Sequence, residues 1–241
     1  MGQEQRVNPE KARSLSTAVL IPGDYALEGL LEWPAAGAIQ GGLVVAHPHP
    51  LYGGSMVQPV VHRVAESARM RGFVTLRFNF RGVGQSTGSY DGQAEYRDVE
   101  EAARFLAARL ADEVEDSQEK PLPMALAGYS FGSLMAAAAA GGEVPVAALV
   151  LIALVVNWEE LPSFVWERLK VFRGPVLAVC GEADELAPPV EVEDLLASLG
   201  LDFRLTVVEG ADHLFMGRQK EVGERVADFL AEVMGESSRE D

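Results

Sequence analysis

Residues 146–156 form an unbroken apolar run that contains no polar side chain. A half-exposed strand alternates apolar and polar positions, so a strand built from this run must be covered on both faces. Short apolar runs alternate with longer stretches of helical period from Thr17 onward. That alternation predicts an α/β fold with a mostly parallel sheet flanked by helices. No apolar run reaches the roughly eighteen residues that a membrane-spanning helix needs.

The positions of the elements follow from these patterns. Eight strands are expected, at residues 17–21, 26–33, 42–46, 73–78, 124–129, 147–155, 175–180 and 203–208. Three helices are expected from single apolar stripes that begin at Val57, Val99 and Val222. We assign residues 17–234 to one domain, between a polar N-terminal arm at residues 1–16 and a polar tail at residues 235–241.

Acidic residues outnumber basic ones, 36 Asp and Glu against 20 Lys and Arg, and the formal net charge is −16. A negative surface repels phosphate backbones and anionic lipids, so neither nucleic acid nor a membrane is expected as a partner. The single cysteine, Cys180, cannot form an internal disulfide, and residues 1–16 contain no apolar signal core. The expected location is therefore cytoplasmic.

A G-x-S-x-G motif stands between an expected strand and an expected helix. Gly128, Ser130 and Gly132 follow the apolar residues 124–127, and a run of alanines continues the motif as far as a glycine pair at residues 141–142. In such a turn the serine is held on a strained backbone, and the glycines let the strand and the helix approach each other. Ser130 is therefore the candidate nucleophile. A close-packed turn without any chemistry is also compatible with this motif alone.

A serine hydroxyl needs a general base, and the base needs a third group that orients it. Asp184 follows one expected strand and His213 follows the next, both at carboxyl ends, where open α/β sheets form their crevice. The chain order Ser130, Asp184, His213 is the order associated with this turn. In isolation, Asp184 also suits a helix cap and His213 an ordinary turn. Three other acids compete for the third role: Glu182, Glu185 and Asp212.

Acyl hydrolysis also needs N–H donors for the negative charge that develops on the carbonyl oxygen. The N–H of Phe131, directly after the serine, is one expected donor. The second is expected from the loop at residues 47–54, whose two prolines have no N–H, so that His49 and Leu51 are the candidates. His49 is the first choice, and the Tyr52 hydroxyl is a side-chain alternative.

Two histidines in this loop raise the question of a metal, and nearby aromatic residues raise that of a substrate pocket. His47 and His49 have no partner at a metal-ligand spacing, so no metal site is expected.

Trp158 belongs to an aromatic-rich segment at residues 157–174, where it suits either a pocket wall or a packed contact such as a homodimer interface. Trp158 and Tyr52 are the candidate substrate-binding residues.

Two segments beside the G-Y-S-F-G turn carry a family resemblance. They read H-P-H-P-x-x-G-G at residues 47–54 and F-N-F-R-G-V-G-x-S-x-G at residues 78–88. With these motifs the chain resembles the α/β-hydrolase superfamily, and within it the small dienelactone-hydrolase-like serine hydrolases, over nearly its whole length. The resemblance implies an eight-stranded hydrolase sheet, no cofactor, and hydrolysis of an acyl ester or a related bond.

The chain departs from this family in two places. Dienelactone hydrolases in the strict sense carry a cysteine where this chain has Ser130, so dienelactone is not the expected substrate. Many relatives insert a helical lid where this chain has only residues 157–174, so little or no lid is expected. The expected activity is that of a serine hydrolase that cleaves a small carboxylic ester or thioester through an acyl-enzyme. A peptidase or amidase with the same three residues, and a non-catalytic binding protein with the same fold, are the alternatives.

Overall fold

The centre of the molecule is an eight-stranded sheet with the order β1-β2-β4-β3-β5-β6-β7-β8. The computed structural model of the chain describes residues 15–112, 121–158 and 163–235. β1 and β4 pair antiparallel with β2, and every other neighbouring pair is parallel. The predicted eight-stranded, mostly parallel sheet is confirmed. The strands are β1 Ser16–Ile21, β2 Leu27–Glu32, β3 Gly41–Ala46, β4 Phe73–Phe78, β5 Met124–Tyr129, β6 Ala148–Ile152, β7 Val176–Gly181 and β8 Phe203–Val208.

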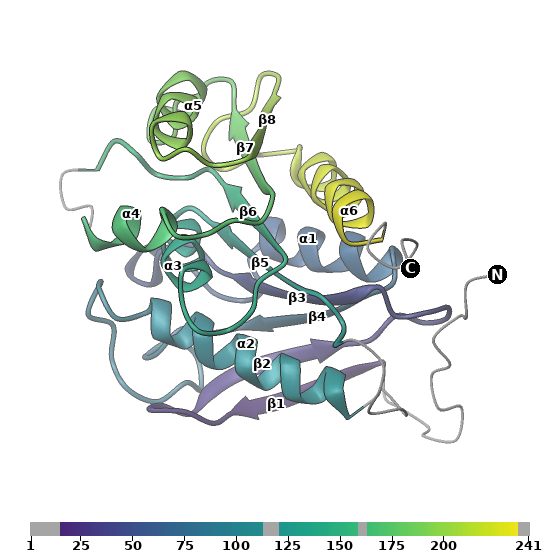
Figure 1. Ribbon diagram of the computed structural model, residues 1–241. Coiled ribbons are helices and arrows are strands. Elements are labelled where there is room, and N and C mark those ends of the chain that lie inside the picture. The colour runs from purple at the N-terminus through teal and green to yellow at the C-terminus, as the bar shows by residue number, and fades with distance from the viewer. Residues whose placement is uncertain (1–14, 113–120, 159–162, 236–241) are drawn as a thin grey trace.

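Helices cover both faces of this sheet (Figure 1). The α-helices of the described residues are α1 Pro59–Met70, α2 Tyr96–Ala111, α3 Phe131–Ala140, α4 Phe164–Leu169, α5 Pro189–Ser198 and α6 Gln219–Gly235. α1 and α6 pack on each other, whereas α3 packs between α2 and α4. α5 packs against β7 and β8. The apolar stripes that the sequence indicates are buried, as in α1, where Val60, Val61 and Val64 face inward. The expected start of this stripe was wrong, because Val57 precedes α1 and is 69% exposed.

The apolar run at residues 146–156 forms a strand only in its middle. β6 is buried at every position, as expected, but it ends at Ile152 and does not reach residue 155. Ala153 has a φ of 47° and donates its N–H to the Val179 carbonyl oxygen at 2.8 Å, so the chain turns out of the strand direction there. The expected end of this strand was wrong. An apolar run indicates only that its residues are buried, and a buried loop is as apolar as a buried strand.

The first strand and the last helix each extend by one residue beyond the domain boundaries that the sequence predicts. β1 begins at Ser16, inside the expected N-terminal arm, and residues 1–14 lie outside the described part. Gly235 is the last residue of α6, and residues 236–241 of the expected tail also lie outside it. The helix α5 was not predicted, because only Val192 and Leu196 are buried and two residues make no recognisable stripe.

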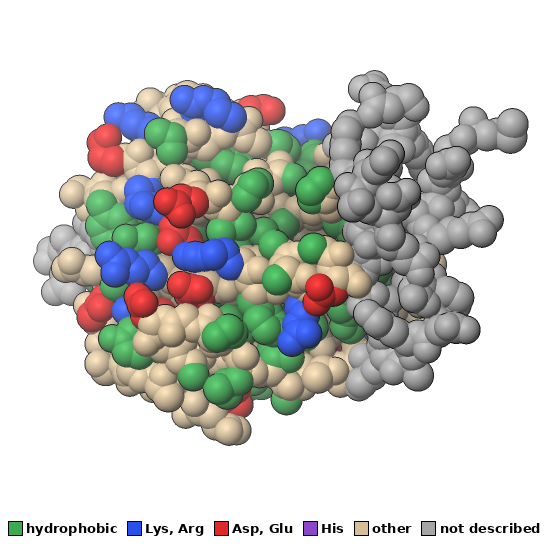
Figure 2. Space-filling view, turned by 60° about the horizontal axis from the view of Figure 1, so that its bottom comes forward, with side chains coloured by type: hydrophobic (Ala, Val, Ile, Leu, Met, Phe, Trp, Pro, Cys, Tyr) green, Lys and Arg blue, Asp and Glu red, His purple; other side chains and the backbone are tan. Residues whose placement is uncertain are grey.

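Charged side chains of both signs are mixed on the face shown in Figure 2. Lys and Arg lie beside Asp and Glu there, with apolar side chains between them. Among the described helices, none is both long and apolar enough to cross a bilayer.

Candidate active site

Ser130 lies at the sharp turn between β5 and α3. Its φ of 55° and ψ of −121° are strained for a residue with a side chain, at a cost of about 1–3 kcal/mol. A Cβ on Gly128 would lie 2.0 Å from the carbonyl oxygen of Gly132, and one on Gly132 would lie 2.5 Å from that of Ala46. Both glycines are therefore required by close backbone approach. The Ser130 N–H donates to the Ile152 carbonyl oxygen at 2.8 Å, which fastens the turn to β6.

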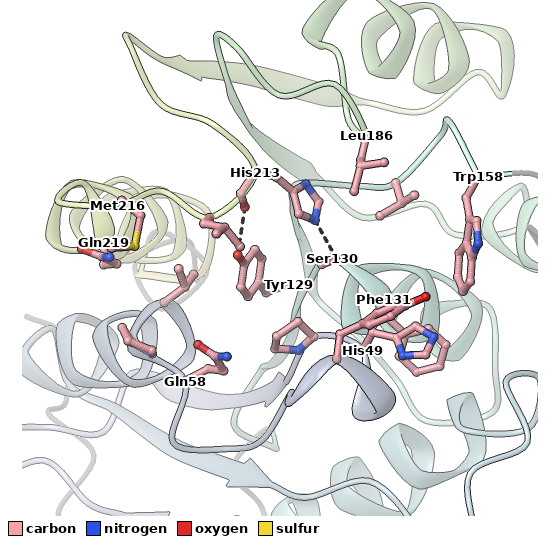
Figure 3. Close-up of a pocket in the computed structure, with 16 residues that line it drawn as sticks. His49, Gln58, Tyr129, Ser130, Phe131, Trp158, Leu186, His213, Met216 and Gln219 are labelled. Atoms are coloured by element: carbon pink, nitrogen blue, oxygen red, sulfur yellow. Dashed lines mark hydrogen bonds between the residues drawn. The ribbon is translucent and has the colours of Figure 1, made fainter.

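The structure brings Ser130, His213 and Asp184 together in a row of hydrogen bonds (Figure 3). Ser130 Oγ lies 2.8 Å from His213 Nε2, and His213 Nδ1 lies 2.9 and 2.8 Å from the two carboxylate oxygens of Asp184. A carboxylate only accepts, so Nδ1 carries the ring hydrogen and the neutral imidazole presents the Nε2 lone pair to the serine hydroxyl. The Asp184 side chain is fully buried, whereas that of His213 is 18% exposed.

The position of Asp184 is fixed from its own loop. Its Oδ1 accepts the N–H groups of Leu186 at 3.0 Å and Ala187 at 2.9 Å. Two of the competing acids have other partners. Glu182 accepts the N–H of Gly210 at 2.9 Å, and Asp212 accepts that of Leu214 at 3.0 Å, so both carboxylates hold the loop that carries His213. The third, Glu185, shows no side-chain contact with His213 among the described residues.

Both first-choice N–H donors come from residues that line the cavity, and neither N–H has an acceptor among the described residues. They belong to Phe131, which begins α3, and to His49, which precedes the short 3-10 helix η1 at Pro50–Tyr52. The N–H of Leu51, the other candidate donor, is already hydrogen-bonded, because it donates to His49 Nδ1 at 3.2 Å. The Leu51 side chain is 71% exposed and does not line the cavity among the described residues. Leu51 is therefore placed away from the serine, and His49 beside it.

The two histidines of the loop hold it in place, each through both of its ring nitrogens. His47 is fully buried, its Nδ1 lies 2.6 Å from the Pro48 carbonyl oxygen, and its Nε2 accepts the Phe80 N–H at 3.1 Å. In His49 the roles are reversed, because Nδ1 accepts from Leu51 while Nε2 lies 2.8 Å from the Tyr90 hydroxyl. A trans peptide points its C=O and N–H in opposite directions, so holding the Pro48 carbonyl also fixes the direction of the His49 N–H.

His47 makes the stability of the protein depend on pH. Burial lowers the pKa of His47 from 6.5 to about 4. Between these values the unfolded chain binds a proton here that the folded protein does not, so stability rises with pH across that window. Acidification from pH 6.5 to 4 is expected to lower the free energy of unfolding by about 3 kcal/mol through this group.

Urea unfolding at neutral pH and near pH 4 tests this expectation. His47→Asn keeps a donor for the Pro48 carbonyl and removes the titrating ring, so its stability should fall less on acidification than that of the wild type. An equal loss in both proteins would mean that other groups cause the acid sensitivity.

A cavity of about 540 Å³ opens at Ser130, a size typical of pockets for small molecules. Both candidate substrate-binding residues line it. Tyr52 is 84% exposed, and Trp158 is half-buried with its ring edge-on to His49 at a centroid distance of 5.4 Å. Between β6 and β7, the described residues hold one helix, α4, which packs on α3 and lines no part of the cavity.

The other lining residues were not expected from the sequence, and four of them carry a polar group or a sulfur atom: Gln58, Tyr129, Met216 and Gln219. The Tyr129 hydroxyl donates to the His213 carbonyl oxygen at 2.8 Å, and burial raises the pKa of Tyr129, so that the donor stays protonated. Its place inside the G-x-S-x-G motif was the available signal. The other three come from loops and helix starts that carry no pattern in the sequence.

Comparison with known proteins places this geometry in a family. Residues 41–240 match the model of the alpha/beta hydrolase domain. An uncharacterized protein of Rickettsia prowazekii is 27% identical over 195 residues, which cover 78% of this chain and 77% of that protein. An alpha-beta serine hydrolase homologue from Coxiella burnetii superposes with a TM-score of 0.77 at 32% identity, covering 89% of this chain and 97% of that one.

A serine hydrolase without a lid from Xanthomonas campestris superposes with a TM-score of 0.75 at 26% identity, covering 95% of this chain and 98% of that one. Similarity therefore extends over nearly the whole sheet, its helices and the turn that carries Ser130. With a family model that matches most of its length, the chain belongs to the α/β-hydrolase family.

Proposed function

We propose that this protein is a serine hydrolase that cleaves an uncharged carboxylic ester or thioester through an acyl-enzyme. One observation carries the proposal: the Ser130–His213–Asp184 row of hydrogen bonds ends in the cavity beside the N–H groups of Phe131 and His49. A nucleophile, a base, an orienting acid and two donors are the complete set that acyl transfer requires.

In the first half of the reaction, Ser130 Oγ attacks the carbonyl carbon while its proton passes to His213 Nε2. The carbonyl oxygen becomes an oxyanion, and the N–H groups of Phe131 and His49 bind it. Asp184 stabilises the imidazolium through Nδ1. When the tetrahedral intermediate collapses, the bond to the leaving alcohol or thiol breaks, and His213 gives that group its proton. The acyl group stays on Ser130 as an ester.

In the second half, water replaces the leaving group. His213 Nε2 takes a proton from the water as its oxygen attacks the acyl carbon, and the same two N–H groups bind the second oxyanion. Collapse breaks the bond to Ser130 Oγ, which recovers its proton from His213. The carboxylic acid product then leaves. No group beyond those of this chain and one water takes part in the proposed cycle.

The lining of the cavity supports an uncharged substrate. Among the described residues that line it, none is Asp, Glu, Lys or Arg, and the titratable side chains are His49, Tyr52, Tyr129 and His213. A carboxylate or an ammonium group on the substrate would lose its hydration there without gaining an ionic partner. This argues for a neutral ester over a charged peptide end.

Intact-mass measurement with a fluorophosphonate tests the proposal without knowledge of the substrate. Wild-type protein is expected to gain one adduct, whereas Ser130→Ala and His213→Ala are expected to gain none, because the reagent requires an activated serine. Burial raises the pKa of the Cys180 thiol to about 12, so this cysteine stays neutral and does not compete. A folded wild type that takes no adduct would refute the proposal and favour a non-catalytic binding protein.

A panel of neutral esters, thioesters and aminoacyl anilides then identifies the bond. Turnover of esters or thioesters is expected, with little turnover of anilides. Faster cleavage of the anilides would instead assign the same three residues to an amidase or a peptidase.

A further inference from the structure

The cavity has two chemically different sides, and the Ser130–His213 pair lies between them (Figure 3). We propose that the substrate is an ester with a planar apolar group on one side of the scissile carbonyl and an uncharged hydrogen-bonding group, such as an amide or a hydroxyl, on the other. We call these the aromatic side and the amide side of the cavity. The inference rests on the proposed ester hydrolysis and adds the class of substrate.

The aromatic side is built around the ring of His49. Ring centroids lie 4.7 Å from it at Tyr52, 5.0 Å at Phe131 and 5.4 Å at Trp158. The hydrogen bonds at both nitrogens of His49 hold this ring in a single orientation, and burial lowers its pKa, so the ring stays neutral. Aromatic rings at these distances offer faces and edges to a planar group, which packs on them with more gain than a flexible chain of equal area.

The amide side is formed by the starts of α1 and α6. Figure 3 shows Gln58 and Gln219 on the opposite side of the Ser130–His213 pair from Trp158. Both glutamines are half-buried, and neither carboxamide has a hydrogen-bond partner among the described residues. Each carboxamide offers both a donor and an acceptor to a ligand.

Gln58 has no evident role in the helix that it begins. It is the N-cap residue of α1, where Ser, Thr, Asp or Asn would bind the exposed N–H groups of the first turn. The Gln58 side chain makes no such capping bond. A residue that is poor for local structure and aimed at the cavity is typical of a binding position.

The backbone on the amide side is held in place from outside the cavity. Asn79 accepts the Met56 N–H at 2.8 Å, and Arg77 donates to the Met56 carbonyl oxygen at 2.8 Å, two residues before Gln58. Near Gln219 on the same side, Phe215 is fully buried with a φ of 51°, and this strained turn leaves its neighbour Met216 exposed at the cavity wall. Supports of this kind let a site hold a ligand without reorganising first.

The test uses matched neutral esters. One pair differs only in a terminal carboxamide against an isopropyl group, and a second pair only in a phenyl against a cyclohexyl ring. Each pair is made with the variable group in the acyl part and again in the alcohol part, and kcat/KM gives two preference ratios. Wild type is expected to favour the carboxamide and the phenyl ring by about tenfold each, in one of the two orientations.

Variants on the two sides should affect different ratios. Gln58→Leu and Gln219→Leu are each expected to lower the carboxamide preference by about threefold or more and to leave the phenyl preference unchanged. Trp158→Leu should do the reverse. Gln93→Leu is the matched control, since Gln93 is exposed and lies outside the cavity lining, and it should change neither ratio. Because the Gln58 side chain makes no capping bond, its replacement should leave the melting temperature unchanged.

Failure of this inference can be told apart from failure of the proposed function. A wild type that takes the fluorophosphonate adduct and cleaves all the esters at similar rates would overturn the two-sided site alone, as would glutamine variants that keep the full carboxamide preference. A wild type with no adduct and no ester turnover would overturn the hydrolase proposal, and the two-sided substrate with it.

Discussion

Ser130→Ala is expected to lower kcat for ester hydrolysis by about 10⁴- to 10⁶-fold, because the acyl-enzyme can no longer form. The fold should survive the change. The Ser130 side chain makes no capping bond to α3, and the methyl group of alanine fits where Cβ already stands. Activity is measured with the best ester of the panel, and stability by thermal unfolding of the same preparation.

Ser198→Ala is the matched control for this variant. Ser198 is an exposed serine at the end of α5, and among the described residues its hydroxyl donates only to the Leu195 carbonyl oxygen. It should keep the wild-type rate. Turnover by Ser130→Ala within tenfold of wild type would show that another group is the nucleophile, and the proposed acyl-enzyme would have to be abandoned.

Asp184→Asn is expected to lower kcat by about 10⁴-fold through the tautomer of His213. The N–H groups of Leu186 and Ala187 need an acceptor, so the amide oxygen of the asparagine takes the place of Oδ1 and its NH₂ group faces His213. Nδ1 must then accept and the ring hydrogen moves to Nε2, where it blocks proton transfer from Ser130. The loss should appear in kcat with little change in KM, and fluorophosphonate labelling should slow in parallel.

Glu182→Gln distinguishes the effect of the His213 tautomer from loosening of the loop that carries His213. Glu182 holds the loop through Gly210 but has no contact with His213 among the described residues. Its replacement should reduce the rate far less than Asp184→Asn does. Equal losses of rate in the two variants would show that both acidic residues act by supporting the loop, and that Asp184 does not act by orienting the imidazole.

The parts of the site that lie at or just beyond the ends of strands could be predicted from the sequence. Ser130, Asp184 and His213 each come directly after a strand or a short turn beyond one, and parallel strands bring their carboxyl ends to one edge. Glycine spacing marked the turn because backbone atoms fill the space of a side chain at Gly128 and Gly132. The sheet was predictable for the same reason, since strands covered on both faces are apolar throughout.

Features that depend on contacts between distant loops were not predictable. The sequence did not show which N–H group of the loop at residues 47–54 would already be hydrogen-bonded within the protein. In the structure it is the N–H of Leu51, which donates to the ring of His49. Likewise, Gln58 and Gln219 are far apart in the chain and line the same side of the cavity only because α1 packs on α6. Such pairings arise from tertiary packing, which leaves no local period to read.

Selection acts differently on the two kinds of residue around this cavity. At Gly128 and Gly132 almost any mutation forces backbone apart, so these positions are closed to change. Tyr52, Leu214 and Met216 line the cavity but are exposed to solvent, so their replacement costs the fold little. New substrate preferences can therefore arise in descendants of this protein by single mutations, while the inherited serine chemistry stays the same.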